Sequence, residues 1–121
     1  KKDGAMTPGT STLDRRLFRL QRLSAMALAV CLVVHLVTMI FAVQGGLTAA
    51  EILDRTRDNS VWLSFYLAFV LMVTLHVPIG LRNILREFTG WSASRVNLVG
   101  LLAGFVLLAL GLRAAWAVFL A

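Results

Sequence analysis

The stretch LHVPIGLRNILRE, residues 75–87, is the feature around which the rest of the chain is organised. An apolar segment that carries one histidine, His76, changes there abruptly to a basic, polar end marked by Arg82 and Arg86. An ionisable side chain inside a membrane-length apolar run is costly, so it usually serves a function. The stretch therefore predicts an α-helix that crosses a membrane and holds a functional histidine near one membrane face.

The composition indicates a membrane protein. Of the 121 residues, 59% are hydrophobic and 15% are charged, whereas a soluble domain is about 45–50% apolar and about 25% charged. The net charge of +6 fits basic segments on the cytoplasmic side of a membrane, and we expect no nucleic-acid partner. Cys31 is the single cysteine, so it forms no disulfide within the chain, and we interpret it as a small buried hydrophobic residue.

Three apolar segments are long enough to cross a hydrocarbon core, over about residues 23–43, 61–86 and 96–120. A signal peptide also has a basic start before an apolar run, but the first segment is too long for one and lacks a clear cleavage site. Short connections make neighbouring helices antiparallel. The predicted fold is therefore an all-α membrane protein, an up-down-up bundle of three transmembrane helices in one domain, residues 15–121.

The amino-terminal residues divide into two parts. Residues 1–14 are small and polar, so we expect a flexible tail, and residues 1–5 are foreign to the protein if Met6 is its native start. From residue 13 to residue 23, arginines alternate with apolar residues. This amphipathic basic segment is typical of a helix at headgroup level, near anionic lipid or an acidic partner.

Two short patterns predict local structure. Thr48 followed by Glu51 is a capping-box pattern, so we expect a short interfacial helix over about residues 49–56. Gly100 and Gly104 lie four residues apart in the third apolar segment, which predicts a face on which another helix packs closely.

Charge asymmetry predicts the orientation in the membrane. The amino-terminal segment and the connection after the second apolar segment are net basic, whereas the first connection is acidic, with Glu51, Asp54 and Asp58. The positive-inside rule then places the amino terminus in the cytoplasm and the carboxyl terminus outside. Because three helices bury little surface on their own, we also expect a partner chain.

Both histidines, His35 and His76, lie inside predicted spans. An unpaired imidazole finds no water in hydrocarbon, so axial ligation of a b-type haem is favoured over an interhelical hydrogen bond. Zinc is disfavoured because structural sites need four N or S ligands. Gly80, one turn beyond His76, leaves room for a flat macrocycle, and Arg82 is placed to meet a propionate.

The two histidines are predicted to lie at different depths. His35 follows Arg22 by thirteen residues and His76 precedes Arg82 by six, so they lie roughly 20 Å and roughly 9 Å from the cytoplasmic end at 1.5 Å per residue. They therefore pair poorly as two ligands of one haem. Either each ligates a different haem that another chain completes, or only one is a ligand.

The segment His76 to Arg82, with Gly80 and Glu87, resembles the second-helix motif of the cytochrome b membrane anchor subunits of succinate dehydrogenases and fumarate reductases. That motif has a haem-ligand histidine, a glycine four residues on, an arginine six on and an acid eleven on. Residues 21–25, QRLSA, are similar to the His-Arg-x-Ser-Gly segment of the family, with glutamine in place of its histidine. The resemblance covers about residues 15–91.

The resemblance implies one or two haem b groups shared with a partner chain, with His76 and His35 as iron ligands. It places Arg22 and Ser24 beside ubiquinone or menaquinone, and we expect Arg22, Arg82 and Asn83 beside the haem. The implied partners are an iron–sulfur subunit, a flavoprotein subunit, a second anchor chain or a copy of this one, and membrane lipid. The implied location is a bacterial inner membrane, and the implied role is electron transfer without bond chemistry in this chain.

Two other functions stay open on the residues alone. The chain fits a cytochrome b anchor of another membrane dehydrogenase, in which the haem is retained and the soluble partner differs. It also fits a non-redox helical membrane subunit in which the histidines make interhelical hydrogen bonds.

Overall fold

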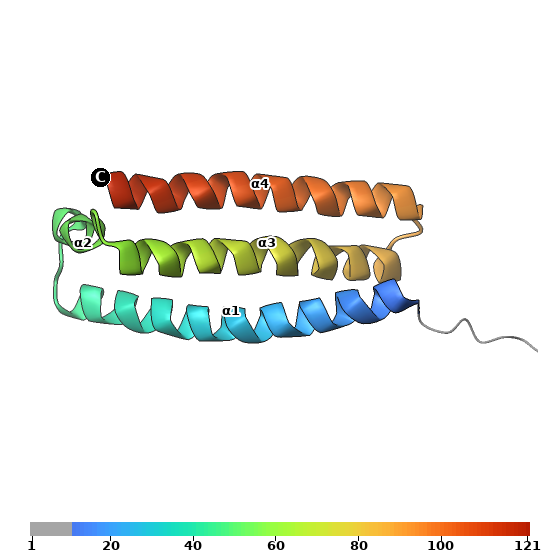
Figure 1. The fold of residues 1–121 in the computed structure, drawn as a ribbon, viewed down its shortest axis with the longest axis horizontal. Coiled ribbons are helices and arrows are strands. Elements are labelled where there is room, and N and C mark those ends of the chain that lie inside the picture. Colours follow the sequence, from blue (N-terminus) through green and yellow to red (C-terminus); the bar gives the residue numbers. More distant parts are fainter. Residues whose placement is uncertain (1–10) are drawn as a thin grey trace, which may run out of the picture.

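The computed structural model describes residues 11–121, which form four α-helices and no strand (Figure 1). Three of these helices are long and apolar enough to cross a membrane. The predicted all-α fold with three candidate spans is therefore confirmed. The helices are α1 (Thr12–Gln44), α2 (Ala49–Thr56), α3 (Ser60–Phe88) and α4 (Ala93–Leu120).

The residue before each helix supplies an amino-terminal cap. The Ser11 side chain accepts a hydrogen bond from the backbone N–H of Asp14, and the Asn59 and Ser92 side chains do the same for α3 and α4. Thr48 and Glu51 form the complete predicted capping box at the start of α2. Because these caps satisfy backbone N–H groups that have no partner within the helix, the caps define where each helix begins.

The amphipathic basic segment and the first span form one unbroken helix of 33 residues. At 1.5 Å per residue α1 is roughly 50 Å long, longer than a hydrocarbon core of about 30 Å, so its basic first turns extend into the headgroup region. α1 begins at Thr12, so residues 12–14 are helical instead of belonging to the predicted tail, because Ser11 caps the helix. The prediction for the earlier residues, including Met6, lies outside the described part.

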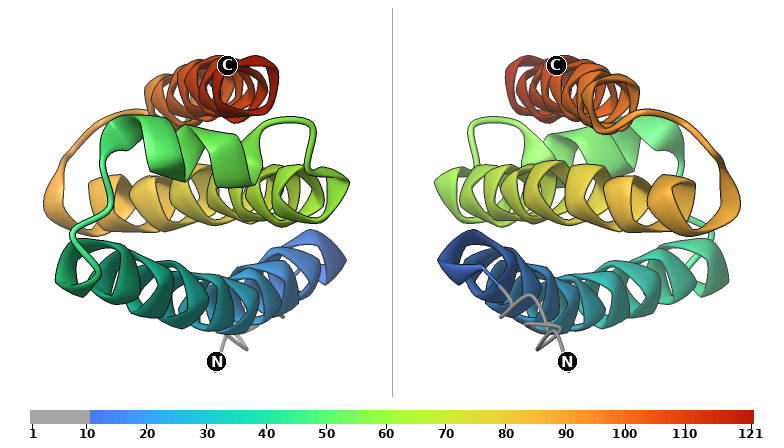
Figure 2. Two further views of the ribbon diagram at one scale, coloured as in Figure 1. Left: turned by 90° about the vertical axis from the view of Figure 1, so that its left-hand side faces the viewer. Right: turned by 90° about the vertical axis from the view of Figure 1, so that its right-hand side faces the viewer.

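Figures 1 and 2 show α3 between α1 and α4 in a single row, and α3 packs on both neighbours. α3 runs antiparallel to α1 and α4, which is the predicted up-down-up order. The row is open, because α1 and α4 lie on opposite sides of α3. α2 lies at the end where α1 finishes and α3 begins, and it also contacts α4.

Small residues allow α4 to approach α3 closely. A Cβ atom added to Gly100 would lie 3.3 Å from the backbone oxygen of Pro78, and one added to Gly104 would lie 2.8 Å from Cγ of the same proline. Further along, a Cβ on Gly111 would lie 2.6 Å from Cγ1 of Val70. The close helix packing predicted from the spacing of Gly100 and Gly104 is therefore confirmed, and its partner surface is the turn around Pro78.

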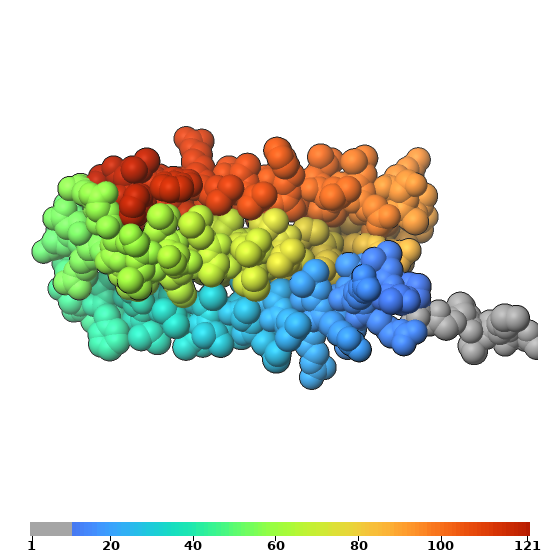
Figure 3. Space-filling model, in the orientation of Figure 1, coloured from blue at the N-terminus to red at the C-terminus, as the bar shows by residue number. Residues whose placement is uncertain are grey.

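Few side chains are buried within the single chain. The buried hydrophobic residues in the described part are Ala42, Ile79, Val96 and Ala115, whereas Phe105 on α4 is 71% exposed. Figure 3 shows the row in space-filling form, with side chains of neighbouring helices in contact along its length. The remaining apolar faces need lipid or another chain to cover them.

Replacing Gly104 by leucine should push α4 away from α3, because Pro78 leaves no space for a side chain there. We expect the free energy of unfolding to fall by about 1–3 kcal/mol, measured by loss of helical circular dichroism in detergent. Ala109→Leu is the matched control, since Ala109 is exposed on the same helix. Equal effects of the two substitutions would contradict the packing described here.

Candidate functional site

His76 lies on α3 where α1 packs against it. Its Nδ1 atom is 3.5 Å from Oγ of Ser24 on α1. Ser24 is 2% exposed, and its hydroxyl also donates to the backbone oxygen of Gln21 at 3.0 Å. The imidazole of His76 therefore has a polar partner on one nitrogen, inside a segment of membrane-spanning composition.

An apolar cleft of about 390 Å³ opens beside His76. It lies between α1 and α3, and small alanine side chains on α1 make part of its wall. No three His, Cys, Asp or Glu side chains of residues 11–121 gather to hold a metal ion, whereas a haem iron takes only axial ligands from the protein. The cleft is lined by His76 and by Ala25, Leu28, Ala29, Leu32, Phe69 and Val73.

A side chain of α1 occupies the space beside Gly80. We expected its missing side chain to leave room for a flat macrocycle, but the amide of Gln21 fills that space. A Cβ atom on Gly80 would lie 2.9 Å from Nε2 of Gln21. Oε1 of Gln21 is buried and has no hydrogen-bond partner in the described chain. The Gln21 side chain therefore occupies the space beside Gly80 in this structure, and the open cleft lies on the Ala25 side of His76.

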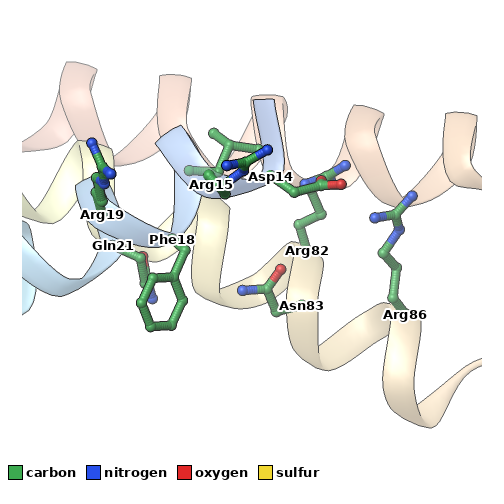
Figure 4. Close-up of a pocket in the computed structure, with 9 residues that line it drawn as sticks. Asp14, Arg15, Phe18, Arg19, Gln21, Arg82, Asn83 and Arg86 are labelled. Carbon is green, nitrogen blue, oxygen red and sulfur yellow. The ribbon is translucent and has the colours of Figure 1, made fainter. Parts of the chain in front are cut away.

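A cavity of about 550 Å³, with several polar and charged residues in its lining, lies between the first turns of α1 and the last turns of α3 (Figure 4). Four arginines and one carboxylate line it, so the cavity is strongly basic. Nε of Arg82 donates to Oδ1 of Asn97 on α4 at 3.0 Å, which ties the half-buried arginine to a third helix. The lining residues are Asp14, Arg15, Leu17, Phe18, Arg19, Gln21, Arg82, Asn83 and Arg86.

The structure brings only some of the predicted site residues together. Arg82 and Asn83 share the basic cavity, but Arg22 is exposed and lies outside its lining, and Ser24 is buried against His76. The roles of Arg22 and Ser24 at the quinone stay predictions. Arg15, Arg19 and Arg86 also line the cavity but were not predicted as site residues. The spacing of four residues between Arg15 and Arg19, and between Arg82 and Arg86, places each pair on one helix face.

His35 lies apart from His76. Its ring meets the rings of Tyr66 and Phe69 on α3 edge-on, with centroids 6.4 Å and 6.1 Å away. These contacts place His35 beside a part of α3 seven to ten residues before His76, which corresponds to about 10–15 Å along the helix. The two imidazoles are thus at different depths, as the sequence predicts, and they do not face each other.

A third cavity, of about 730 Å³, lies at the other end of the row, between α1, α2 and α3. Aromatic rings of Trp62 and Tyr66 and the guanidinium of Arg55 line part of it, together with apolar side chains of α1. Such a mixture of aromatic, cationic and apolar groups is typical of the membrane–water interface. This cavity contains neither histidine.

Comparison with known proteins identifies the family. The family model described as succinate dehydrogenase/fumarate reductase transmembrane subunit matches residues 5–117. The chain belongs to this family. Membership of the succinate dehydrogenase/fumarate reductase transmembrane family implies association with the other subunits of such a complex. No curated protein and no solved structure matches this chain.

The residues around His76 fit the haem b that anchors of this family carry. The apolar cleft would supply walls for a macrocycle, and Nδ1 faces Ser24, so Nε2 is the ring nitrogen that would be available to iron. Arg82 lies six residues beyond His76 on the same helix, but it lines the basic cavity and not this cleft, so its place beside a haem stays a prediction. The residues that would hold the haem on this side are therefore His76, with Ser24 behind it, and the apolar side chains of the cleft.

Gln21→Met removes an amide whose oxygen is buried without a partner and keeps a side chain of similar length. A buried, unsatisfied acceptor costs about 1–3 kcal/mol, so we expect equal or higher thermal stability of the purified anchor in detergent. Gln44→Met, at the exposed end of α1, is the control and should change little. Marked destabilisation by Gln21→Met alone would show that the amide makes interactions not described here.

Proposed function

We propose that the chain is a haem b-binding membrane anchor of a succinate dehydrogenase/fumarate reductase-type complex and passes electrons between its iron–sulfur subunit and the quinone pool. The observation that carries this proposal is His76, whose imidazole borders an apolar cleft and has one nitrogen held by a buried hydroxyl. Family membership supports the proposal, because it supplies the kind of complex in which such a site works.

Haem b, when bound, supplies a one-electron carrier. The chain's own residues determine how that carrier is held. Nε2 of His76 would hold the iron, and the alanine and leucine side chains of the cleft would exclude water from the site. Arg82, six residues beyond His76, would stabilise an acidic group that extended from this cleft toward the basic cavity. Burial and the axial imidazole are the means by which a protein tunes a haem potential.

The basic cavity is the proposed site for the quinone head group. The Asn83 amide and the Arg82 and Arg86 guanidinium groups are hydrogen-bond donors. They suit the carbonyl oxygens of a quinone and the negative charge that develops on them during reduction. The cavity lies at the arginine-rich end of the row, which we propose faces the cytoplasm and the iron–sulfur subunit.

His35 has two possible roles that follow from its position. His35 and His76 differ too much in depth along the helix axis to ligate one haem together. His35 therefore ligates a second haem only if a partner chain completes that site. A second anchor, or a copy of this chain, seated on the exposed apolar faces would be that partner. The edge-on contacts of His35 with Tyr66 and Phe69 instead suit a role in helix packing within this chain.

A non-redox membrane subunit is the second candidate function. One specific observation favours it: the contact between Ser24 and His76 already gives the imidazole a partner across two helices. In that case the histidine only joins α1 to α3, and the purified complex contains no haem.

His76→Ala should remove one haem from the assembled complex while the helices still form. The measurement is the haem content by reduced-minus-oxidised spectrum, with circular dichroism to show that the fold is retained. His35→Ala should remove a different haem or none. Loss of the same haem in both variants would contradict the separation of the two histidines.

Arg82→Gln should raise the KM for quinone. A hydrogen bond to a charged group contributes about 1.5–3 kcal/mol, so we expect roughly a tenfold change or more in steady-state quinone reduction. Asn97→Ala is one control, because it removes the partner of Arg82 but keeps the charge. Arg113→Gln, an exposed arginine near the other end of α4, is the second. An unchanged KM in Arg82→Gln would exclude this arginine from the quinone site.

A further inference from the structure

The buried hydroxyl of Ser24 has two polar neighbours, the backbone oxygen of Gln21 and Nδ1 of His76. The two distances together determine how the hydroxyl interacts with His76. Oγ lies 3.0 Å from the backbone oxygen of Gln21 in the preceding turn of α1. It also lies 3.5 Å from Nδ1 of His76 on α3. The second distance is long for a hydrogen bond, but it leaves no room for a water molecule between the two atoms.

The direction of the second contact follows from counting protons. A serine hydroxyl has one proton and two lone pairs, and a backbone carbonyl oxygen only accepts. The proton of Ser24 is therefore used in its shorter contact, toward Gln21. Only a lone pair remains toward His76, so Nδ1 of the neutral imidazole must carry the hydrogen that is shared there.

We infer that Ser24 is a positioning residue that selects the Nδ1–H form of His76 and keeps the Nε2 lone pair available for iron. This role rests on the proposed function, since it requires His76 to be an iron ligand. A hydrogen-bond acceptor behind a ligating histidine fixes the tautomer and the orientation of the ring and raises its basicity. A more basic axial imidazole favours the ferric state, so the Ser24 contact lowers the haem potential.

The fold holds Ser24 in place from two sides. Its hydroxyl is tied to the turn that begins at Gln21, and the amide of Gln21 is seated against Gly80 on α3. Ser24 is 2% exposed, so water cannot replace its oxygen as the acceptor. By contrast, Ser64 on α3 makes the same kind of bond to its own helix, to the backbone oxygen of Ser60, but it is exposed and makes no hydrogen bond to either histidine in the described chain.

The test is Ser24→Ala in the assembled complex, with Ser64→Ala as the matched control. In Ser24→Ala we expect the midpoint potential of the haem assigned to His76 to move upward in a redox titration. Losing such a partner typically costs about 10–100-fold in affinity, so we expect that haem to pass to excess apomyoglobin about tenfold faster or more. Ser64→Ala should change neither quantity, and Ser24→Thr should restore both toward wild type.

Identical potentials and transfer rates in Ser24→Ala and Ser64→Ala would overturn the role of Ser24. If the Ser24→Ala complex does not assemble, the tautomer of His76 can be measured directly. The measurement is 15N-histidine NMR of the wild-type complex, purified from haem-deficient cells so that His76 has no iron bound. A proton on Nδ1 of His76 supports the inference, and a proton on Nε2 overturns it. The proposed function fails separately, if His76→Ala keeps its full haem content.

Discussion

The contact between α1 and α3 around Gly80 is the interaction on which the rest of the site depends. Because Gly80 has no side chain, the Gln21 amide can sit directly against α3. This close approach brings Ser24, one turn further along α1, within 3.5 Å of His76. The same approach closes the space at Gly80 and leaves the cleft on the alanine side of the imidazole. A larger residue at Gly80 would meet the Gln21 side chain and force it to move from its place against α3.

α3 also packs against α4, on the side opposite α1. The glycines of α4 pack against Pro78, two residues from His76. Asn97 of α4 then reaches the Arg82 side chain. The histidine and the basic cavity are therefore fixed from both sides of one helix. The outer faces of α1 and α4 remain apolar and exposed, as expected for a subunit that meets lipid and other chains of its complex.

Much of the fold could be predicted because it depends on local patterns. Segment length identified the three spans, and Thr48 with Glu51 identified the start of α2. The site was harder, because the face that α1 presents to α3 depends on the rotation of each helix about its axis. The sequence therefore did not show that Gln21, rather than a cofactor, fills the space at Gly80, or that Ser24 lies behind His76. The arginines of the basic cavity come from two segments more than sixty residues apart, and their grouping appears only when the helices are packed.

The central claim is that His76 ligates a haem rather than simply joining two helices. The most direct measurement is the low-temperature reduced-minus-oxidised absorption spectrum of the complex purified with this anchor, combined with the haem content per complex. Ligation of a haem by His76 predicts b-type bands and at least one haem for each copy of the chain or for each pair of anchors. A pure, assembled complex without b-type bands would contradict it and would leave the Ser24–His76 contact as an interhelical hydrogen bond alone.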